Sequence, residues 1–461
     1  MKVPAAEALH AAEARALAAD ALPAELAFST DTRTLRPGDA YVALRGERFD
    51  GHDFIAPALA AGAVALVVDR EAAVPVGVPA LVVADTAKAY LAFGAVARRR
   101  SSARFVAITG SAGKTTTKAF LAHLLECAAP GRTLATPSNE NNEIGVAKLL
   151  LGLGGGERYV TVEFGARHYG EIAPLALAAR PETAVLTNIG EAHLEVFGSR
   201  ERLAETKWGI FASGARRVTG AGDSTSRDLA ARDRVAATWF GIDDDPPAPP
   251  GEASVVLAGR TELRVAAPAA APRAFPVRVG VPGEHNLRNV AAAAAAAIDL
   301  GLEPELVAAN LATLELPAGR YERTSAGAFD VVYDAYNANP SGVRATLASF
   351  ATERGERRIA VLGSMAELGA DAAAMHRAAG ADAAAARLDA LLVGGEFADD
   401  LARGAREAGM PAERIVAFAD NAAAAAWLRA NGRPGDVVLL KGSRKYRLEE
   451  ILTELRGAHA G

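Results

Sequence analysis

The most constraining feature of this chain is a strand, a glycine-rich turn and the start of a helix in direct succession. The apolar run Phe105–Ile108 leads at once into Thr109-Gly110-Ser111-Ala112-Gly113-Lys114-Thr115-Thr116-Thr117. Such a turn lets backbone N–H groups converge on phosphate at the positive end of a helix. Within it, Lys114 would neutralise phosphate charge and the Thr115 hydroxyl would reach Mg²⁺. The segment therefore predicts an α/β domain that binds a nucleotide through Thr109 to Thr116.

The spacing of this turn differs in one respect from that of most P-loops. The usual pattern has a glycine at the position that Ile108 occupies in this chain. The difference points away from the GTPase-like majority and excludes few other nucleotide-hydrolysing proteins. The alternative interpretation of the segment is an ordinary strand-to-helix turn without a ligand.

Polar side chains follow two further apolar runs of the same region. The run Val160–Val162 ends at Glu163, and the run Ala184–Leu186 leads toward His193. Strands that alternate with helices form a mostly parallel sheet, and ligands gather at the carboxyl ends of its strands. A carboxylate there can bind the metal of a nucleotide, and a neutral imidazole can ligate a second cation. The alternatives are an exposed glutamate and a structural histidine.

The length of the chain, 461 residues, favours about three domains of roughly 150 residues each. We predict a small α/β domain over residues 1–101, because short apolar runs alternate there with Pro- and Gly-bearing turns. Its strand candidates are Tyr41–Leu44, Val64–Val68 and Leu81–Val83, and the polar stretch at 98–102 ends it.

The P-loop then belongs to a central domain over residues 102–316. After a Pro/Asp-rich loop at Asp243–Pro250, the stretch Val255–Val279 alternates like antiparallel strands, and Ala291–Ala297 predicts a close-packed helix. A third domain over 317–461 is predicted to be similar to dinucleotide-binding folds. Its strand candidates are Val331–Tyr333, Ile359–Leu362, Leu391–Val393, Ile415–Phe418 and Val437–Leu440.

Composition and charge bear on the cellular compartment of the chain and on the partners that it can bind. No apolar stretch approaches the roughly 18 residues that cross a bilayer, and Glu7, Glu13 and Asp20 interrupt the N-terminal alanines, unlike a secretory signal. The net charge of −5 provides no general attraction to nucleic acid or anionic lipid. The single cysteine, Cys127, fits a reducing compartment and is expected to be a buried small side chain. We expect a soluble cytoplasmic monomer without nucleic acid or membrane insertion.

Further motifs occur in a fixed order over nearly the whole chain. They are Gly38–Phe54, Asn139–Val146, Glu163–Ala166, Asn188–His193, Lys207, Gly283–Asn289, Gly319–Arg320, Asp334–Pro340, Val361–Gly363, Glu367–Gly369 and Lys441–Arg444. With the P-loop, this series resembles the Mur ligases, ATP-dependent enzymes that form amide bonds in peptidoglycan precursors. The segments at 141–145 and 336–340 are most similar to the member that joins D-alanyl-D-alanine to UDP-N-acetylmuramoyl-tripeptide.

The resemblance implies an α/β fold with the three-domain Mur ligase architecture. A small N-terminal UDP-binding domain would precede a central P-loop ATPase domain with a mostly parallel sheet and a C-terminal Rossmann-like domain. The residues implied for the UDP-sugar are Thr32, Arg45, Asp50 and His52, and those for the acceptor substrate are Asn141 and Asn142. Those implied for ATP, besides the P-loop, are Asn286 and Asn289 at the adenine and Arg320, Asp334 and Asn337 from the third domain. The asparagines could instead be turn residues or helix caps.

The resemblance also implies a metal-dependent site. Two Mg²⁺ ions would be held by Thr115, Glu163, His193 and a CO₂-derived carbamate on Lys207, and Lys114, His193 and Lys207 would be the catalytic residues. An unmodified ammonium would repel a second Mg²⁺, whereas a carbamate offers negative charge and oxygen ligands. The alternative is an unmodified Lys207 that pairs with phosphate or with Glu205.

The implied reaction activates a carboxylate as an acyl phosphate, which the amine of D-alanyl-D-alanine then attacks to give the UDP-linked pentapeptide, with no protein nucleophile. Four positions depart from the family pattern: Trp208, Gly209, Ser364 and Tyr333. The departures leave open a Mur-type amide ligase that acts on another carboxylate and amine. A nucleotide-dependent binding or switch protein without ligation is the second alternative.

Overall fold

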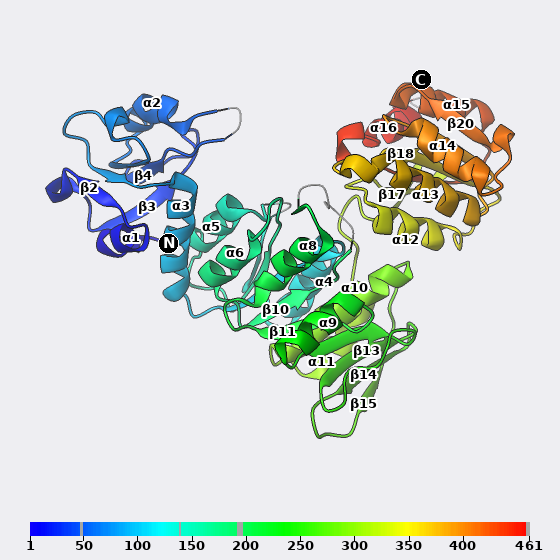
Figure 1. The fold of residues 1–461 in the computed structure, drawn as a ribbon, viewed down its shortest axis with the longest axis horizontal. Coiled ribbons are helices and arrows are strands. Elements are labelled where there is room, and N and C mark those ends of the chain that lie inside the picture. Colours follow the sequence, from blue (N-terminus) through cyan, green and yellow to red (C-terminus); the bar gives the residue numbers. More distant parts are fainter. Residues whose placement is uncertain (47–48, 138–139, 191–196, 458–461) are drawn as a thin grey trace.

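Three α/β units follow one another along the chain (Figure 1). The structure is a computed structural model and describes residues 1–46, 49–137, 140–190 and 197–457. Within these ranges each unit has its own sheet, of six, nine and six strands. Most neighbouring strands in the sheets run parallel, which confirms the predicted α/β fold class.

The first unit is a six-stranded sheet in the order β1-β3-β4-β5-β6-β2. Its strands are β1 (Val3–Pro4), β2 (Arg15–Leu17), β3 (Glu25–Ser29), β4 (Asp39–Val42), β5 (Ala65–Val68) and β6 (Ala80–Val82), and its helices are α1 (Ala5–Ala11), α2 (Ile55–Ala60) and α3 (Thr86–Arg99). The run from β3 to β6 is parallel, and the two outer strands pair antiparallel. All four residues of β5 are buried, as expected for an inner parallel strand.

Helix α3 connects the first unit to the second. Its N-cap is Asp85, whose carboxylate accepts hydrogen bonds from two backbone N–H groups of the first turn. The helix packs on α1 and also on α5 (Glu143–Leu151) and α6 (Ile172–Ala179) of the next unit, so one apolar core runs through both. The predicted boundary at residue 101 falls just after this helix, and the bounds of the three domains stay predictions.

The central unit is a nine-stranded sheet in the order β15-β14-β13-β12-β11-β10-β7-β9-β8. Its strands are β7 (Arg104–Thr109), β8 (Thr133–Ala135), β9 (Tyr159–Glu163), β10 (Thr183–Leu186), β11 (Arg216–Gly220), β12 (Thr238–Ile242), β13 (Ala253–Ala258), β14 (Glu262–Ala266) and β15 (Arg273–Pro276). The last three pair antiparallel, as the alternation of the sequence predicts. Besides α5 and α6, the helices are α4 (Lys114–Ala128), α8 (Arg200–Trp208), α9 (Ser224–Asp233), α10 (Glu284–Asp299) and α11 (Pro304–Asn310).

Helix α10 confirms the prediction of a close-packed alanine helix. Residues 291–297 are fully buried, and the helix contacts α4 and strands β10 to β13. Alanine keeps a helix near a sheet because its side chain is short, and it carries the highest helix propensity. The packing fixes the first turn of α10 beside the P-loop helix.

The third unit is a six-stranded sheet in the order β16-β17-β21-β18-β19-β20. Its strands are β16 (Glu322–Ala326), β17 (Phe329–Asp334), β18 (Arg358–Gly363), β19 (Ala390–Gly394), β20 (Ile415–Phe418) and β21 (Val437–Lys441), and its helices are α12 (Pro340–Phe350), α13 (Ala372–Ala385), α14 (Ala398–Glu407), α15 (Asn421–Asn431) and α16 (Glu449–Gly457). All strands except β16 are parallel. Strand β21 lies between β17 and β18, which sets Lys441 beside Asp334 at the carboxyl edge.

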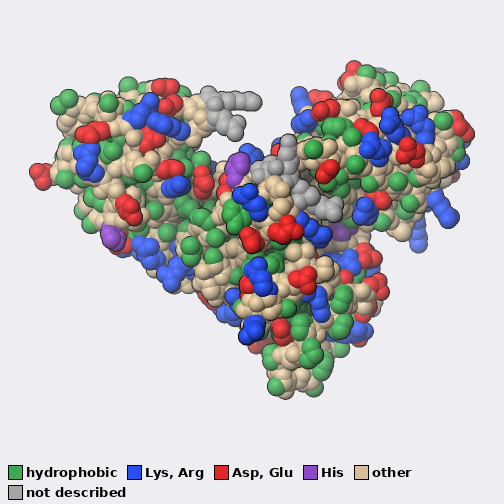
Figure 2. Space-filling model, viewed as in Figure 1, with side chains coloured by type: hydrophobic (Ala, Val, Ile, Leu, Met, Phe, Trp, Pro, Cys, Tyr) green, Lys and Arg blue, Asp and Glu red, His purple; other side chains and the backbone are tan. Residues whose placement is uncertain are grey.

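The first and third units stand apart above the central unit, and the surface is hollowed between them (Figure 2). No helix within the described ranges is both long and apolar enough to cross a bilayer. Cys127 is half-buried, so the prediction of a buried side chain is wrong. The reason is its place on α4 one turn after His123, whose ring Nε2 lies 3.6 Å from the cysteine Sγ on the partly open face of the helix.

Candidate active site

The P-loop between β7 and α4 depends on two glycines for which a larger residue would not fit. Gly110 has φ of +149°, and a Cβ there would lie 1.9 Å from Thr187 Oγ1. Gly113 has φ of +80°, and a Cβ there would lie 2.3 Å from Asn289 Oδ1. Both positions combine a conformation that favours glycine with close approach of a neighbouring side chain.

The loop is held against the end of β10. Ser111 N donates to Asn188 O at 2.9 Å, and Ala112 N donates to Asn188 Oδ1 at 3.1 Å. The Lys114 ammonium folds back over the loop and donates to Gly110 O at 2.8 Å. Burial lowers the pKa of Lys114, and the charge of Glu163 opposes that shift. The glycine-rich loop therefore has a compact conformation with Lys114 folded over it, and its binding of phosphate stays a prediction.

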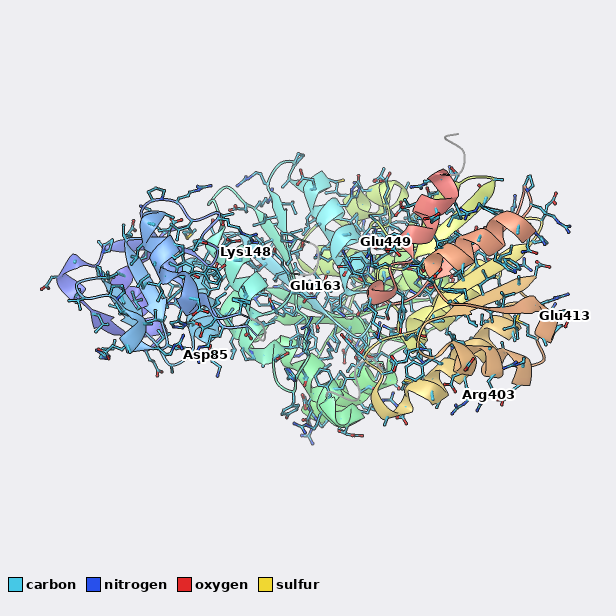
Figure 3. The ribbon with its side chains drawn as sticks, turned by 90° about the horizontal axis from the view of Figure 1, so that it is seen from above. Asp85, Lys148, Glu163, Arg403, Glu413 and Glu449 are labelled. Carbon is cyan, nitrogen blue, oxygen red and sulfur yellow. The ribbon has the colours of Figure 1, made fainter. Side chains whose placement is uncertain are left out.

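Glu163, at the carboxyl end of β9, is the buried carboxylate of the site, with 2% of the residue exposed. Asn141 Nδ2 donates to its Oε1 at 2.9 Å, and Lys118 Nζ lies 3.5 Å from its Oε2. The alternative of an exposed glutamate is thereby excluded. Figure 3 places Glu163 near the middle of the molecule. Sequence reasoning missed Lys118, although its position four residues after Lys114 predicts the same helix face.

Lys207, in the last turn of α8, is also buried, with 2% exposed. Burial is the main cause that lowers its pKa to about 7, and the charge of Lys114 adds to the effect. Glu163 thus faces a group of three lysines, Lys114, Lys118 and Lys207. Burial lowers the pKa of each lysine, and the charge of Glu163 opposes that shift. Among the described residues around Glu163, buried lysines outnumber buried carboxylates, which favours anionic ligands.

Oxygen donors suited to Mg²⁺ are present at this point. Glu163 Oε2 is buried, and its 3.5 Å separation from Lys118 exceeds ordinary hydrogen-bond length, so it retains capacity for a cation. The Thr115 hydroxyl is the second such oxygen. Among the described residues no three His, Cys, Asp or Glu side chains form a metal-binding group. His193, the remaining predicted ligand, lies outside the described residues.

The third unit contributes a second polar cluster. Lys441 Nζ lies 2.9 Å from Asp334 Oδ2 and donates to Asn337 O at 2.9 Å. Thr346 Oγ1 donates to the same Asp334 oxygen at 2.5 Å. Arg320 reaches the central unit, where its Nη2 donates to Thr115 Oγ1 at 3.2 Å. Sequence reasoning assigned no role to Lys441, because only the sheet order brings it to Asp334.

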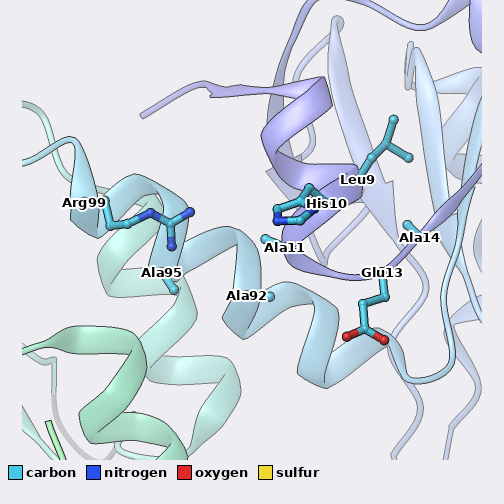
Figure 4. A pocket seen from close by; sticks show the side chains of 8 residues that line it. All are labelled: Leu9, His10, Ala11, Glu13, Ala14, Ala92, Ala95 and Arg99. Atoms are coloured by element: carbon cyan, nitrogen blue, oxygen red, sulfur yellow. The ribbon is translucent and has the colours of Figure 1, made fainter.

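One cavity of about 630 Å³ contains both clusters. Its lining includes the P-loop, Glu163 and Lys207 from the central unit and Arg320, Asp334, Asn337 and Lys441 from the third. Asn286 and Asn289 line it as well, and Asn289 Nδ2 donates to Asn286 Oδ1 at 3.2 Å. His285, which sequence reasoning missed, borders it too, and burial lowers the pKa of its imidazole to about 4. A separate, wide-open cavity of about 830 Å³ between α1 and α3 lacks such strand-end clusters (Figure 4).

The two predicted acceptor-binding asparagines have partners inside the protein. Asn141 holds Glu163, as described above. Asn142 caps α5, because its Oδ1 accepts a hydrogen bond from Gly145 N at 2.9 Å. Both residues nevertheless line the cavity, so contact with a substrate remains a prediction.

The cap gives a testable consequence. Asn142→Ala is expected to lower the free energy of unfolding by about 1 kcal/mol, because the α5 N-terminus loses its side-chain acceptor. Denaturant unfolding measures this change, and Asn142→Asp serves as the matched control that keeps the acceptor. An Asn142→Ala protein with unchanged stability and impaired turnover would contradict the cap as the main role.

The first unit gathers three of the four residues predicted for the UDP-sugar. The His52 imidazole is buried, with its Nδ1 2.6 Å from Asp50 Oδ1 and its Nε2 3.2 Å from Asp69 Oδ1. Arg45 Nη2 lies 2.9 Å from Asp69, and Arg70 Nη2 lies 2.6 Å from Asp50. Thr32 is half-buried in the turn after β3. Sequence reasoning missed Asp69 and Arg70, although they directly follow the buried strand β5, just as the buried strand β9 ends in Glu163.

The four departures from the family pattern have packing roles outside the cavity lining. Trp208 Nε1 donates to Asp233 Oδ2 at 2.8 Å, and a Cβ on Gly209 would lie 3.2 Å from Ala173 Cβ. Ser364 is buried, donates to Gly394 O at 3.1 Å and accepts from Phe397 N at 3.0 Å. The Tyr333 hydroxyl donates to Glu449 Oε2 at 3.3 Å.

A P-loop facing a buried carboxylate, lysines and a second α/β unit defines a nucleotide-dependent phosphoryl-transfer site. Comparison with protein families agrees with this class. The Mur ligase family catalytic domain matches residues 27–98, the Mur ligase middle domain 108–297, and the Mur ligase glutamate ligase domain 319–444. The chain belongs to the Mur ligase family.

Relatives of known name are similar over almost their full length. The UDP-N-acetylmuramoyl-tripeptide--D-alanyl-D-alanine ligase of Escherichia coli is 36% identical, with 93% of each chain covered. That of Bacillus subtilis is 30% identical over 93% of this chain and 92% of its own. Among solved structures, MurF from Acinetobacter baumannii has a TM-score of 0.86 at 29% identity, with 99% of each chain covered. MurF ligase from Thermotoga maritima in complex with ADP has a TM-score of 0.79 at 28% identity, covering 94% of this chain and 97% of that one. The three-domain Mur ligase architecture implied by the sequence is confirmed.

Proposed function

We propose that this chain joins D-alanyl-D-alanine to UDP-N-acetylmuramoyl-tripeptide, with conversion of ATP to ADP and phosphate. The observation that carries the proposal is the single cavity shared by the P-loop, Glu163 and Lys207 of one unit and Arg320, Asp334 and Lys441 of another. Similarity to ligases of that name over nearly the whole chain supports the substrates. The product is the UDP-linked pentapeptide used for peptidoglycan.

The reaction needs two bond-forming steps. A carboxylate oxygen of the tripeptide attacks the γ-phosphorus of ATP, and the bond from that phosphorus to ADP breaks. The amine of the dipeptide then attacks the acyl carbon of the resulting acyl phosphate, phosphate leaves, and the nitrogen loses a proton. Lys114 is placed to offset charge on the transferring phosphoryl group, and no protein nucleophile takes part. Exclusion of water from the reacting groups would protect the acyl phosphate from hydrolysis.

The charges of the site support a metal-bound nucleotide and a modified lysine. Bound Mg²⁺ would neutralise phosphate charge, and we propose Thr115, Glu163, His193 and a carbamate on Lys207 as the groups that hold two ions. Carbamate formation needs a neutral amine, and a Lys207 pKa of about 7 provides one near neutral pH. The carbamate would also add a negative charge to that of Glu163 beside Lys114 and Lys118.

Binding roles for the remaining residues follow from their positions. We propose that the half-exposed Arg45 and Arg70, set on Asp50, His52 and Asp69, receive the UDP diphosphate together with Thr32. Asn286 and Asn289 would border the adenine, and Arg320, Asp334 and Asn337 would contact the nucleotide from the third unit. We propose a monomer that acts in the cytoplasm, where ATP and UDP-linked precursors are available.

Phosphate release against a panel of substrates tests the proposal. The expected result is rapid release with UDP-N-acetylmuramoyl-tripeptide and D-alanyl-D-alanine together and slow release when either is replaced by a folate, a free amino acid or another dipeptide. Faster release with a different pair would favour the alternative of a Mur-type ligase for other substrates. The packing roles of Trp208, Gly209 and Ser364 speak against that alternative.

A further inference from the structure

Three cationic side chains of the third unit line the shared cavity, namely Arg320, Lys441 and Arg444, and they differ in their polar partners. Arg320 donates to Thr115 Oγ1, and Lys441 forms a buried ion pair with Asp334. Arg444 is exposed, and among the described residues no carboxylate lies within ion-pairing distance of its guanidinium. A cation that borders a substrate cavity without an ion-pair partner is available for an anionic group of a substrate.

The Arg444 side chain is nevertheless positioned. Its guanidinium lies 5.3 Å from the centre of the Tyr336 ring, and the Arg320 guanidinium lies 4.6 Å from the same ring. A guanidinium attracted to a ring keeps its in-plane N–H groups available for hydrogen bonds. The neighbouring Ser443 is buried, and its Oγ accepts from Ala366 N at 2.9 Å, which fixes the backbone from which Arg444 extends.

The incoming dipeptide carries a carboxylate at the end opposite its reacting amine. An arginine can bind such a group with two parallel hydrogen bonds, a geometry that orients as well as attracts. We infer that Arg444 binds the C-terminal carboxylate of the incoming dipeptide. This inference rests on the proposed function, because it assigns a residue to one of its two substrates.

Arg167 is the competing candidate. It follows β9, is exposed and lines the same cavity. Its loop leads into α6, which packs on α3 of the first unit, so it lies on the side where the UDP-linked substrate is proposed to bind. Arg444 instead extends from the third unit, beside Tyr336, which suits the other substrate, the dipeptide.

The test pairs a change in the enzyme with a change in the substrate. Arg444→Ala is expected to raise the KM for D-alanyl-D-alanine roughly 10- to 100-fold, the effect of losing a hydrogen bond to a charged group, with the KM for ATP and for the tripeptide changed less than threefold. Arg444→Lys should recover part of the loss. The wild type should use D-alanyl-D-alaninamide as poorly as Arg444→Ala uses D-alanyl-D-alanine. Arg444→Ala should use the amide little worse than the wild type does, because the same interaction is already lost. Lys445→Ala, which removes a neighbouring exposed cation paired with Glu396, is the matched control.

Trapping of the acyl phosphate with hydroxylamine separates this inference from the proposed function. Arg444→Ala should give the hydroxamate of the tripeptide at the wild-type rate, because the dipeptide takes no part in that step. Absence of hydroxamate with the wild type would overturn the proposed function. Normal hydroxamate formation, together with equal losses for the dipeptide and its amide in Arg444→Ala, would overturn the role of Arg444. If Arg167→Ala, and not Arg444→Ala, shows a large loss with the dipeptide and little further loss with its amide, the carboxylate is bound by Arg167 instead.

Discussion

Replacement of Lys114 by alanine is expected to lower the rate of amide formation about 100- to 1000-fold, or ~3 to 4 kcal/mol in the transition state. The ammonium lies within the P-loop, bonded to Gly110 O, where phosphate is proposed to bind. Its charge therefore acts on the transferring phosphoryl group. The fold should be retained, since the lysine contacts its own loop and contributes nothing to the apolar core.

Steady-state turnover and thermal unfolding measure the two parts of this prediction. Lys148→Ala is the control, because that lysine is an exposed cation of the same unit, 2.8 Å from Glu140. It should leave turnover unchanged. A Lys114→Ala enzyme that turns over within threefold of the wild type would refute the phosphate role.

Replacement of Lys207 is expected to be nearly as damaging, with roughly 100-fold or greater loss of turnover for both Lys207→Ala and Lys207→Arg. Under the carbamate proposal the alanine variant loses a metal ligand, and the arginine variant keeps a positive charge that cannot be modified. Short carboxylic acids should partly restore Lys207→Ala, because they can occupy the vacated position, but should not restore Lys207→Arg.

The carbamate on Lys207 can be tested by measuring wild-type turnover while the CO₂ concentration and the pH are varied. Removal of CO₂ and bicarbonate should lower wild-type turnover, and bicarbonate should restore it. Because the pKa of Lys207 is about 7, the neutral amine that reacts with CO₂ becomes scarce as pH falls below 7, so the requirement for bicarbonate should grow there. Near-normal turnover of Lys207→Arg would eliminate the carbamate and favour an unmodified lysine.

The sequence predicted the parts of the site that depend on local pattern. The P-loop follows from adjacent residues, and the position of Glu163 follows from a buried strand that ends in a carboxylate. The general fold could also be predicted, since alternating strands and helices determine parallel sheets. The spacing of four residues between Lys114 and Lys118 likewise indicates that both lie on one face of the helix, so Lys118 could have been included in the predicted site.

Other parts depend on contacts between distant segments. Lys441 meets Asp334 only because β21 inserts beside β17, and His52 meets Asp69 only because β5 follows β4 in the sheet. Asn142 shows a different limit. The motif that carries it predicted substrate contact, whereas an asparagine before a helix serves equally well as a cap, and the structure shows that it does.

The mass of the product tests the central claim most directly. The chain is incubated with ATP, Mg²⁺, UDP-N-acetylmuramoyl-tripeptide and D-alanyl-D-alanine, and the mixture is analysed by mass spectrometry. The proposal predicts a species with the combined mass of tripeptide and dipeptide substrates less one water, formed together with equal amounts of ADP and phosphate. ADP and phosphate without that species, or no consumption of either substrate by a folded protein, would contradict it.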